Sequence, residues 1–172
     1  MKKFKLIKSD VYDLASVLAT VIREQSEKLD FKEVIGIQKS VNYFLGEIKD
    51  FADSFEEITK ERNGYIEIAN KKIEAFKQTL QKGAESDGKI DEEYKAKLDV
   101  FVEMSLESTK ALIATEINPQ MEALYLEIGK TEVEFELEDT KHKMVIDAFE
   151  KYAKEKYNDK KKMVLVYEIL TA

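Results

Sequence analysis

The sequence predicts an α+β fold that is mostly helical, with a long antiparallel helical hairpin projecting from a small base of about three short strands and two shorter helices. Three observations lead to this expectation. Only six glycines and one proline occur among 172 residues, which favours long helices. Apolar residues recur in steps of three and four over a long stretch, and in a later segment the period changes to two.

The longest periodic stretch predicts a helix that begins after the N-cap residue Asp30 and runs to about residue 82. Its a/d pattern breaks near Arg62 and resumes at Ile66. Asn63–Gly64 at this break forms either a tight turn or a bend in a continuous helix. We favour the continuous helix because the apolar stripe resumes at once. The stripe contains Val34, Ile37, Val41, Phe44, Ile48, Phe51, Phe55 and Ile58 before the break, and Ile66, Ala69, Ile73, Phe76 and Leu80 after it.

The length of this helix implies that it protrudes. A helix from 31 to 82 would be roughly 78 Å long at about 1.5 Å per residue. A compact domain of this size has a radius of gyration of about 16 Å. We therefore expect the helix to pair with the one that follows the loop Gly83–Lys89. This assigns residues of about 46–119 to the hairpin, and about 1–45 and 120–172 to the base of a single domain.

The second hairpin helix is expected to begin at Asp91. Asn118–Pro119 predicts either a kink or a stop followed by a restart, and the restart fits because Asn is a good cap and Pro suits the first helical position. Gly129 is expected to be the C-terminal cap. The apolar positions of this segment are Tyr94, Leu98, Phe101, Met104 or Ser105, Leu112, Ile113, Met121, Leu124, Tyr125 and Ile128.

The base is predicted from the remaining segments. Residues 3–8 alternate as a strand, and Ser9–Asp10 are expected to cap a helix that ends near Lys28. Residues 132–138 form the clearest alternating strand, and Asp139–Thr140 are expected to cap the helix after it. Residues 163–170 form the last strand, apolar on both faces and therefore well covered.

The first strand and the Glu-rich strand are expected to pair. Lys3 and Lys5 alternate in the same way as Glu132, Glu134 and Glu136, so pairing of the two strands would place opposite charges across from each other. The alternative for this acidic cluster is a metal or acid–base site, but neither a second cluster nor a histidine spacing supports it.

Composition excludes several classes of function. The formal charge is −7, and only Arg23 and Arg62 are arginines, which argues against direct binding of nucleic acid. The chain has no cysteine, so zinc–thiolate sites and cysteine nucleophiles are excluded. The single histidine, His142, cannot build a di-iron bundle, and we expect it to be an exposed helix residue. No membrane, small-molecule substrate or cofactor is expected.

Two further motifs favour structural interpretations. Residues 87–91 copy the middle of an EF-hand loop, but Gly83 and Tyr94 stand where an oxygen ligand and a bidentate Glu are needed. A polar loop followed by an Asp cap is therefore favoured over calcium binding. Lys160, Lys161 and Lys162 are expected to form a solvated turn.

The basic N-terminus resembles the start of a secretion signal. However, Ser9, Asp10 and Asp13 interrupt the apolar run that should follow it. We therefore expect a soluble protein.

Three segments resemble a type of small uncharacterised bacteriophage protein. They are the charged aromatic run Lys49–Arg62, the Gly-containing loop Ser86–Lys89, and the alternating strand Glu132–Leu137. The resemblance covers about the middle two-thirds of the chain and rests on composition and order. It implies a phage origin and a non-enzymatic role, and it carries no functional residues over. With this origin, we expect a protein of the host cytoplasm that is either free or incorporated into a virion.

These observations favour a structural or assembly protein that contacts itself or another structural protein. The alternative is an acidic binding protein that inhibits a host protein such as a defence nuclease by presenting phosphate-like carboxylates. The expected interaction residues are Phe44, Phe51, Phe55, Ile58, Glu132, Glu134 and Glu136.

Overall fold

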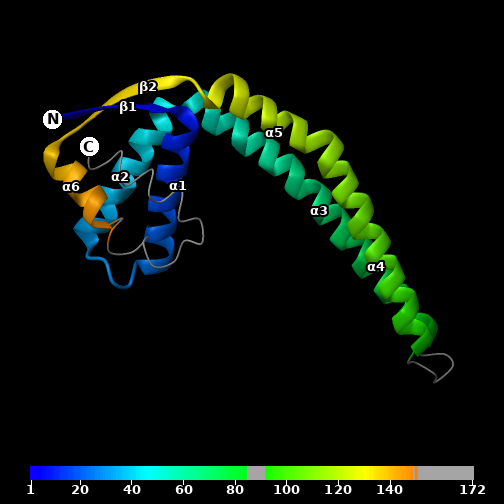
Figure 1. Ribbon diagram of the computed structural model, residues 1–172. Helices are drawn as coiled ribbons and strands as arrows, with labels where there is room; N and C mark the ends of the chain where they lie inside the picture. Colours follow the sequence, from blue (N-terminus) through cyan, green and yellow to red (C-terminus); the bar gives the residue numbers. More distant parts are fainter. Residues whose placement is uncertain (85–91, 149, 151–172) are drawn as a thin grey trace. The chain divides into compact units, whose positions relative to one another are not determined.

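The computed structural model describes residues 1–84, 92–148 and 150, and these residues are mostly helical (Figure 1). The chain divides into two compact units. The first contains residues 1–53 and the chain from Leu124 onward, and the second contains residues 54–123. The described residues contain two strands, and the third expected strand, 163–170, lies outside them.

The two strands of the first unit pair as the sequence predicts. β1 (Lys2–Ile7) is antiparallel to β2 (Glu132–Leu137), and Phe4 lies opposite Phe135. Because side chains alternate along a strand, the apolar residues point to one face and the charged residues to the other. Phe4, Leu6, Phe135 and Leu137 are all buried.

Helix α1 (Lys8–Gln25) follows β1 without a loop, and this corrects the expected Ser9–Asp10 cap. The N-cap is Ile7, which makes no side-chain capping bond, and Asp10 lies in the first turn. The backbone N–H of Lys8 donates to the Thr131 carbonyl at 3.0 Å, so it is satisfied by the chain next to β2. A strand that runs directly into a helix removes the need for a side-chain cap at this N–H.

Helix α2 (Phe31–Glu47) begins as predicted. Asp30 accepts bonds from the backbone N–H groups of Lys32 and Glu33, and the Glu33 carboxylate accepts from the Asp30 N–H, which completes a capping box. The helix ends at Ile48, whose φ of −120° and ψ of 29° are not helical. The expectation of one continuous helix from 31 to 82 is therefore wrong at this residue.

The sequence concealed this break because the apolar spacing continues through it. Phe44, Ile48 and Phe51 are all fully buried, although Ile48 lies between two helices. Helix α3 (Lys49–Ala84) then begins, and its first residues belong to the first unit.

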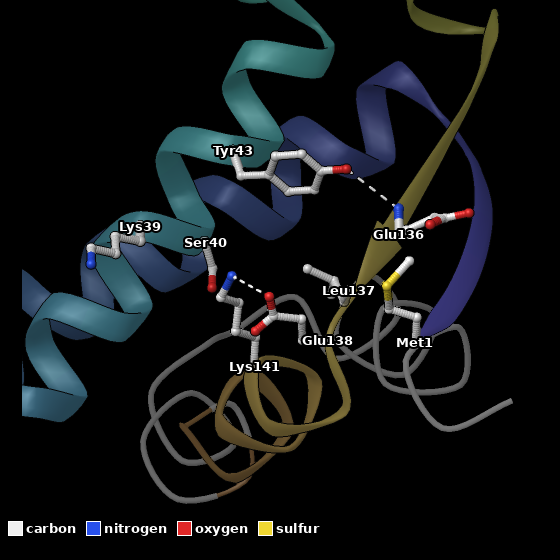
Figure 2. Close-up of a pocket in the computed structure, with 8 residues that line it drawn as sticks. All are labelled: Met1, Lys39, Ser40, Tyr43, Glu136, Leu137, Glu138 and Lys141. Atoms are coloured by element: carbon white, nitrogen blue, oxygen red, sulfur yellow. Dashed lines mark hydrogen bonds and ion pairs between the residues drawn. The ribbon is translucent and has the colours of Figure 1, made fainter.

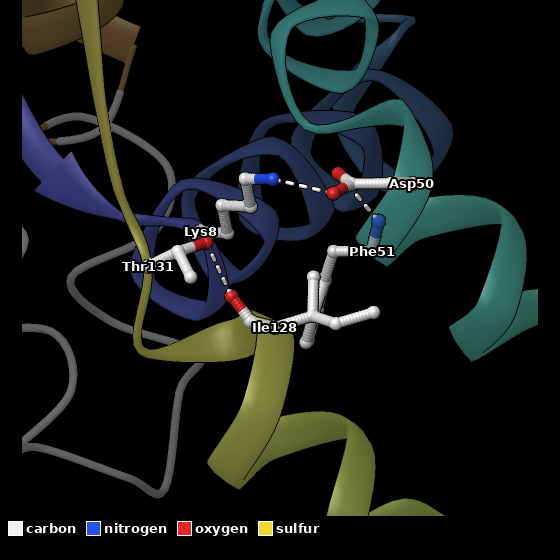
Figure 3. Close-up of polar contacts among 5 residues, drawn as sticks. All are labelled: Lys8, Asp50, Phe51, Ile128 and Thr131. Atoms are coloured by element: carbon white, nitrogen blue, oxygen red, sulfur yellow. Dashed lines mark hydrogen bonds and ion pairs between the residues drawn. The ribbon is translucent and has the colours of Figure 1, made fainter.

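Polar contacts surround the start of α3 (Figure 3). The Lys8 ammonium donates to the Asp50 carboxylate, and another oxygen of that carboxylate accepts from the Phe51 N–H at 2.9 Å. The hydrogen bond from Lys8 lowers the pKa of Asp50 below its ordinary value. The Thr131 hydroxyl donates to the Ile128 carbonyl at 2.7 Å and fixes the turn before β2. Lys8 thus contacts the start of α3 through its side chain and the turn before β2 through its backbone N–H.

Aromatic rings form two clusters in the core of the first unit. Phe135 stacks on Phe4 with centroids 5.3 Å apart and meets Phe44 edge-on at 5.3 Å. In the second cluster, Phe51 meets Tyr12 at 5.6 Å and Tyr125 at 5.4 Å, both edge-on. Edge-on and offset-stacked arrangements are the favoured geometries of aromatic pairs.

Helix α6 (Asp139–Ala148) closes the described core against α2. The two helices approach closely at Gly36, where an added Cβ would lie 2.2 Å from the Met144 sulfur. Gly129 has a similar packing role, because an added Cβ would lie 3.0 Å from the Phe51 ring. The helix before β2 does end at Gly129, but the C-cap residue is Lys130, so the expected cap role of Gly129 is wrong.

In the second unit, α3 runs antiparallel to α4 (Glu92–Leu112) and α5 (Asn118–Leu124) (Figure 1). The Phe76 and Phe101 rings stack with centroids 4.1 Å apart. The Tyr94 hydroxyl donates to the Lys77 carbonyl at 3.4 Å, and the Gln120 amide donates to Glu61 at 3.4 Å. Because residue numbers rise along one partner as they fall along the other, these contacts fix the antiparallel direction.

The helices continue through both positions at which the sequence suggested an interruption, Asn63–Gly64 and Asn118–Pro119. Asn63 and Gly64 lie inside α3, so the continuous helix is confirmed there. Before Pro119 the backbone widens into a π-helical segment, Ile113–Ile117, and the Asn118 N–H donates to the Ile113 carbonyl. Asn118 itself is helical, with φ −59° and ψ −40°, so the predicted stop and restart is wrong. A π segment accommodates the ring and the missing N–H of proline without ending the helix.

Candidate interaction site

The outer face of the β1–β2 sheet brings three of the predicted residues together. The Lys3 ammonium lies 2.9 Å from the Glu136 carboxylate, and the Lys5 ammonium lies 2.6 Å from Glu132. Glu134 lies directly opposite Lys5 in the strand register. The acceptor carboxylates raise the pKa of both lysines above the ordinary value. Two lysines therefore partly neutralise three glutamates on this face.

This charge pattern weakens the case for a phosphate-mimicking surface. A mimic of nucleic acid needs contiguous unpaired negative charge, because phosphate-binding proteins are attracted by that field. Here Glu132 and Glu136 are each in contact with a lysine. Exposed pairs of this kind contribute little to stability, so their main effect is on the surface field.

The phenylalanines predicted for interaction have different environments. Phe44 and Phe51 are fully buried in the first unit, so their side chains are core residues and do not offer a surface to a partner. Phe55 and Ile58, on the part of α3 in the second unit, are half-buried. The sequence could not separate these pairs, because both lie on the same heptad stripe.

A pocket of about 330 Å³ lies between α2, β2 and α6 in the first unit (Figure 2). The Tyr43 hydroxyl reaches across it and accepts the Glu136 N–H at 3.3 Å. The Lys141 ammonium lies 3.4 Å from Glu138, and the Met1 amino group lies 3.2 Å from Asp139. The lining combines both signs of charge: Met1, Lys39, Ser40, Tyr43, Glu136, Leu137, Glu138 and Lys141.

The chemistry of this pocket is limited by its hydrogen bonds. The Ser40 hydroxyl is buried and donates to the Gly36 carbonyl of its own helix at 3.1 Å. That proton therefore serves the helix backbone, whereas a nucleophilic serine would donate it to a base. Among the described residues no group of three or more acidic, histidine or cysteine side chains could hold a metal ion.

His142 corrects another expectation, because it is buried and only 6% exposed. Its ring lies on Phe4 with centroids 5.1 Å apart. The sequence did contain a signal for this position, because His142 precedes the buried Val145 by one helical turn. His142 therefore belongs to the packing between α6 and the sheet. The EF-hand-like residues 87–91 and Lys160–Lys162 lie outside the described residues.

Six of the exposed apolar side chains in the described part of the chain lie on the helices of the second unit. Met104 is 65% exposed and Val100 is 57% exposed, although both lie on a helix whose neighbouring face packs on α3. The apolar spacing of the sequence indicated Met104 or Ser105 as one apolar position of this helix, but it did not indicate that Met104 and Val100 are exposed. The group contains Ile66, Ile68, Val100, Met104, Leu106 and Leu112.

Comparisons of the chain with protein-family models, with curated proteins and with solved structures give no match. Among the described residues, none of the helices has the length and apolar character needed to cross a membrane.

Proposed function

We propose that this chain is a non-enzymatic structural or assembly protein that acts through protein–protein contacts, as a homo-oligomeric component of a bacteriophage virion. The observation that carries the proposal is the group of exposed apolar side chains on α3 and α4. Scattered single apolar residues are ordinary on a surface, but Val100 and Met104 lie one helical turn apart and are both more than half exposed, which favours an interaction surface.

The length of α3 supports the same proposal. Its 36 residues correspond to roughly 54 Å, which exceeds the diameter of roughly 41 Å of a compact chain of this size, whose radius of gyration is about 16 Å. In our proposal, residues 54–123 form a helical hairpin that projects from a base and places its apolar side chains within reach of neighbouring subunits.

The acidic-inhibitor alternative receives less support. It requires an acidic surface, and the pairing of Lys3 and Lys5 with glutamates on β2 reduces the negative field of the sheet. Tight binding to a basic host protein that weakens strongly with salt would favour this alternative over assembly.

Light scattering across a concentration series tests the proposal. Self-assembly predicts a mass that rises above the 19.9 kDa of one chain as concentration increases. A monomer mass throughout would remove self-association. Pull-down from the native source then asks whether capsid or tail proteins are retained, and failure of both experiments would overturn the assembly function.

A further inference from the structure

We infer that the exposed face of α4 is a homodimer interface in which two copies of α4 pack antiparallel around a two-fold axis. This inference rests on the proposed self-association and specifies the surface that performs it. The face is a stripe of six exposed residues in alternating steps of four and three, which we call the α4 stripe. It contains Glu93, Lys97, Val100, Met104, Glu107 and Ala111.

The α4 stripe lies on a flank of the helix that α3 does not cover. Tyr94 and Phe101 contact α3, and they follow Glu93 and Val100 by one residue. One residue corresponds to about 100° around a helix with 3.6 residues per turn. The stripe is therefore turned well away from α3. Its members are all exposed, whereas the residues that follow its first four members are half-buried: Tyr94, Leu98, Phe101 and Ser105.

The spacing of the stripe is that of a coiled-coil seam. Steps of four and three keep side chains on the side of a helix that faces a partner, and apolar residues are preferred at the centre. Val100 and Met104 occupy that centre, and charged residues flank them on both sides. A seam with only two apolar residues per chain predicts a weak, reversible dimer.

The order of charges selects a second copy in the antiparallel direction. When the stripe is reversed and placed on itself, Val100 faces Met104, Lys97 faces Glu107, and Glu93 faces Ala111. Each Lys97–Glu107 contact occurs twice because of the two-fold axis. Parallel pairing would instead place Lys97 against Lys97 and Glu107 against Glu107, which is repulsive.

The intrachain contact of Lys97 is compatible with this arrangement. Its ammonium lies 2.6 Å from Glu93, one turn earlier on the same helix, with the lysine side chain 58% exposed. An ammonium has three donors, so it can keep Glu93 and also donate to Glu107 of a second copy. The aliphatic stem of Lys97 would cover the apolar centre.

Reciprocal charge variants test the interface by sedimentation equilibrium. Lys97→Glu places two glutamates against each other, and Glu107→Lys places two lysines against each other, so each variant should weaken dimerisation at least about tenfold. An equimolar mixture of the two variants should form a heterodimer, because both contacts are then complementary. The double variant in one chain should recover the homodimer.

Control variants remove the effect of net charge. Lys95→Glu and Asp99→Lys make the same charge changes at exposed positions outside the α4 stripe. They should dimerise as the parent does, and helicity at 222 nm should confirm that every variant is folded. If the stripe variants and the controls weaken association equally, the interface assignment is overturned.

Disulfide trapping tests the register, because the natural chain has no cysteine. Val100→Cys mixed with Met104→Cys should give a crosslinked heterodimer faster than either variant alone crosslinks. Faster crosslinking of one variant with itself would overturn the antiparallel register. If the parent and all the charge variants associate equally well, this interface is refuted but the proposed function stands. A parent that stays monomeric refutes the interface and limits the function to assembly on another protein.

Discussion

Phe51→Ala should be among the most destabilising single substitutions in the first unit. Phe51 is fully buried and meets both Tyr12 and Tyr125 edge-on. Truncating a buried Phe to Ala costs about 3–5 kcal/mol, and two lost aromatic pairs place this site at about 4–5 kcal/mol. For a chain of this length, about 2–4 °C is lost per kcal/mol, so the melting temperature should fall by roughly 8–20 °C.

Thermal and urea unfolding followed by circular dichroism at 222 nm measures this loss. The matched control is Phe31→Ala, which makes the same change at a side chain that is 78% exposed. That variant should remain within about 0.5 kcal/mol of the parent. If Phe51→Ala melts within a degree or two of Phe31→Ala, then Phe51 is not a core residue and our account of the α3 start is wrong.

The contact between Phe51 and Gly129 provides an internal check on the same reasoning. An added Cβ at Gly129 would lie 3.0 Å from the Phe51 Cε2 atom, so Gly129→Ala alone should cost about 1–3 kcal/mol through overpacking. In the Phe51→Ala background the ring is absent, and the new methyl group should cost much less. Strictly additive free energies in this double-mutant cycle would contradict the contact.

Four further predictions test other parts of the structure. Gly64→Ala should stabilise the protein by about 0.5–1 kcal/mol in urea unfolding, because Gly64 lies inside α3 with no atom near the added methyl; a loss of stability would favour the turn that we rejected. Gly36→Ala should destabilise in the same assay because its methyl would meet Met144, and Met144→Ala should relieve that effect. Asp50→Asn should reduce the loss of folding free energy that the parent shows as the pH is lowered. Because the pKa of Asp50 is lowered in the folded state, its carboxylate stabilises the fold above about pH 5. That contribution is lost as the pH falls through the lowered pKa, and the Asn variant does not have it to lose. Lys5→Glu should lower the melting temperature by placing like charges near Glu132 and Glu134, and the loss should shrink in 1 M salt, whereas a salt-independent loss would argue against a charge effect.

Local patterns were sufficient to predict several elements. The alternation of Lys and Glu residues predicted both strands and their pairing, because charge and period agree there. Asp30 as an N-cap residue predicted the start of α2, and the structure shows that Glu33 completes a capping box with it. In each case the information lies within a few residues or in two matching patterns, so no tertiary knowledge was needed.

Several predictions were wrong because a tertiary contact or a change of helical backbone geometry replaced a local signal. The N–H of Lys8 is satisfied by Thr131, so the Ser9–Asp10 cap is not used. Before Pro119, a π segment accommodates the proline within the helix. His142 reads as polar, but the Phe4 ring provides a surface on which imidazole packs well.

One heptad pattern also contained residues with two different structural roles. The stripe that contains Phe44 and Phe51 fills the core of the first unit, whereas Ile66 on α3 of the second unit is 36% exposed. Periodicity reports that one face is apolar, but it does not report what covers that face. The break at Ile48 keeps the spacing, so the sequence alone could not place the boundary between α2 and α3.

The α4 stripe was missed for the complementary reason. Only Val100 and Met104 are strongly apolar among its six members, and the sequence pattern placed Met104 or Ser105 with the apolar positions expected to pack on the other hairpin helix. Its meaning depends on knowing that the adjacent positions, Tyr94 and Phe101, are already committed to α3. Once that face is fixed, the remaining seam is left with apolar residues at its centre and opposite charges at equal distances on either side. The charge pattern is therefore complementary to its own reverse, which is what a two-fold antiparallel interface requires. A face selected only for solubility does not need this property.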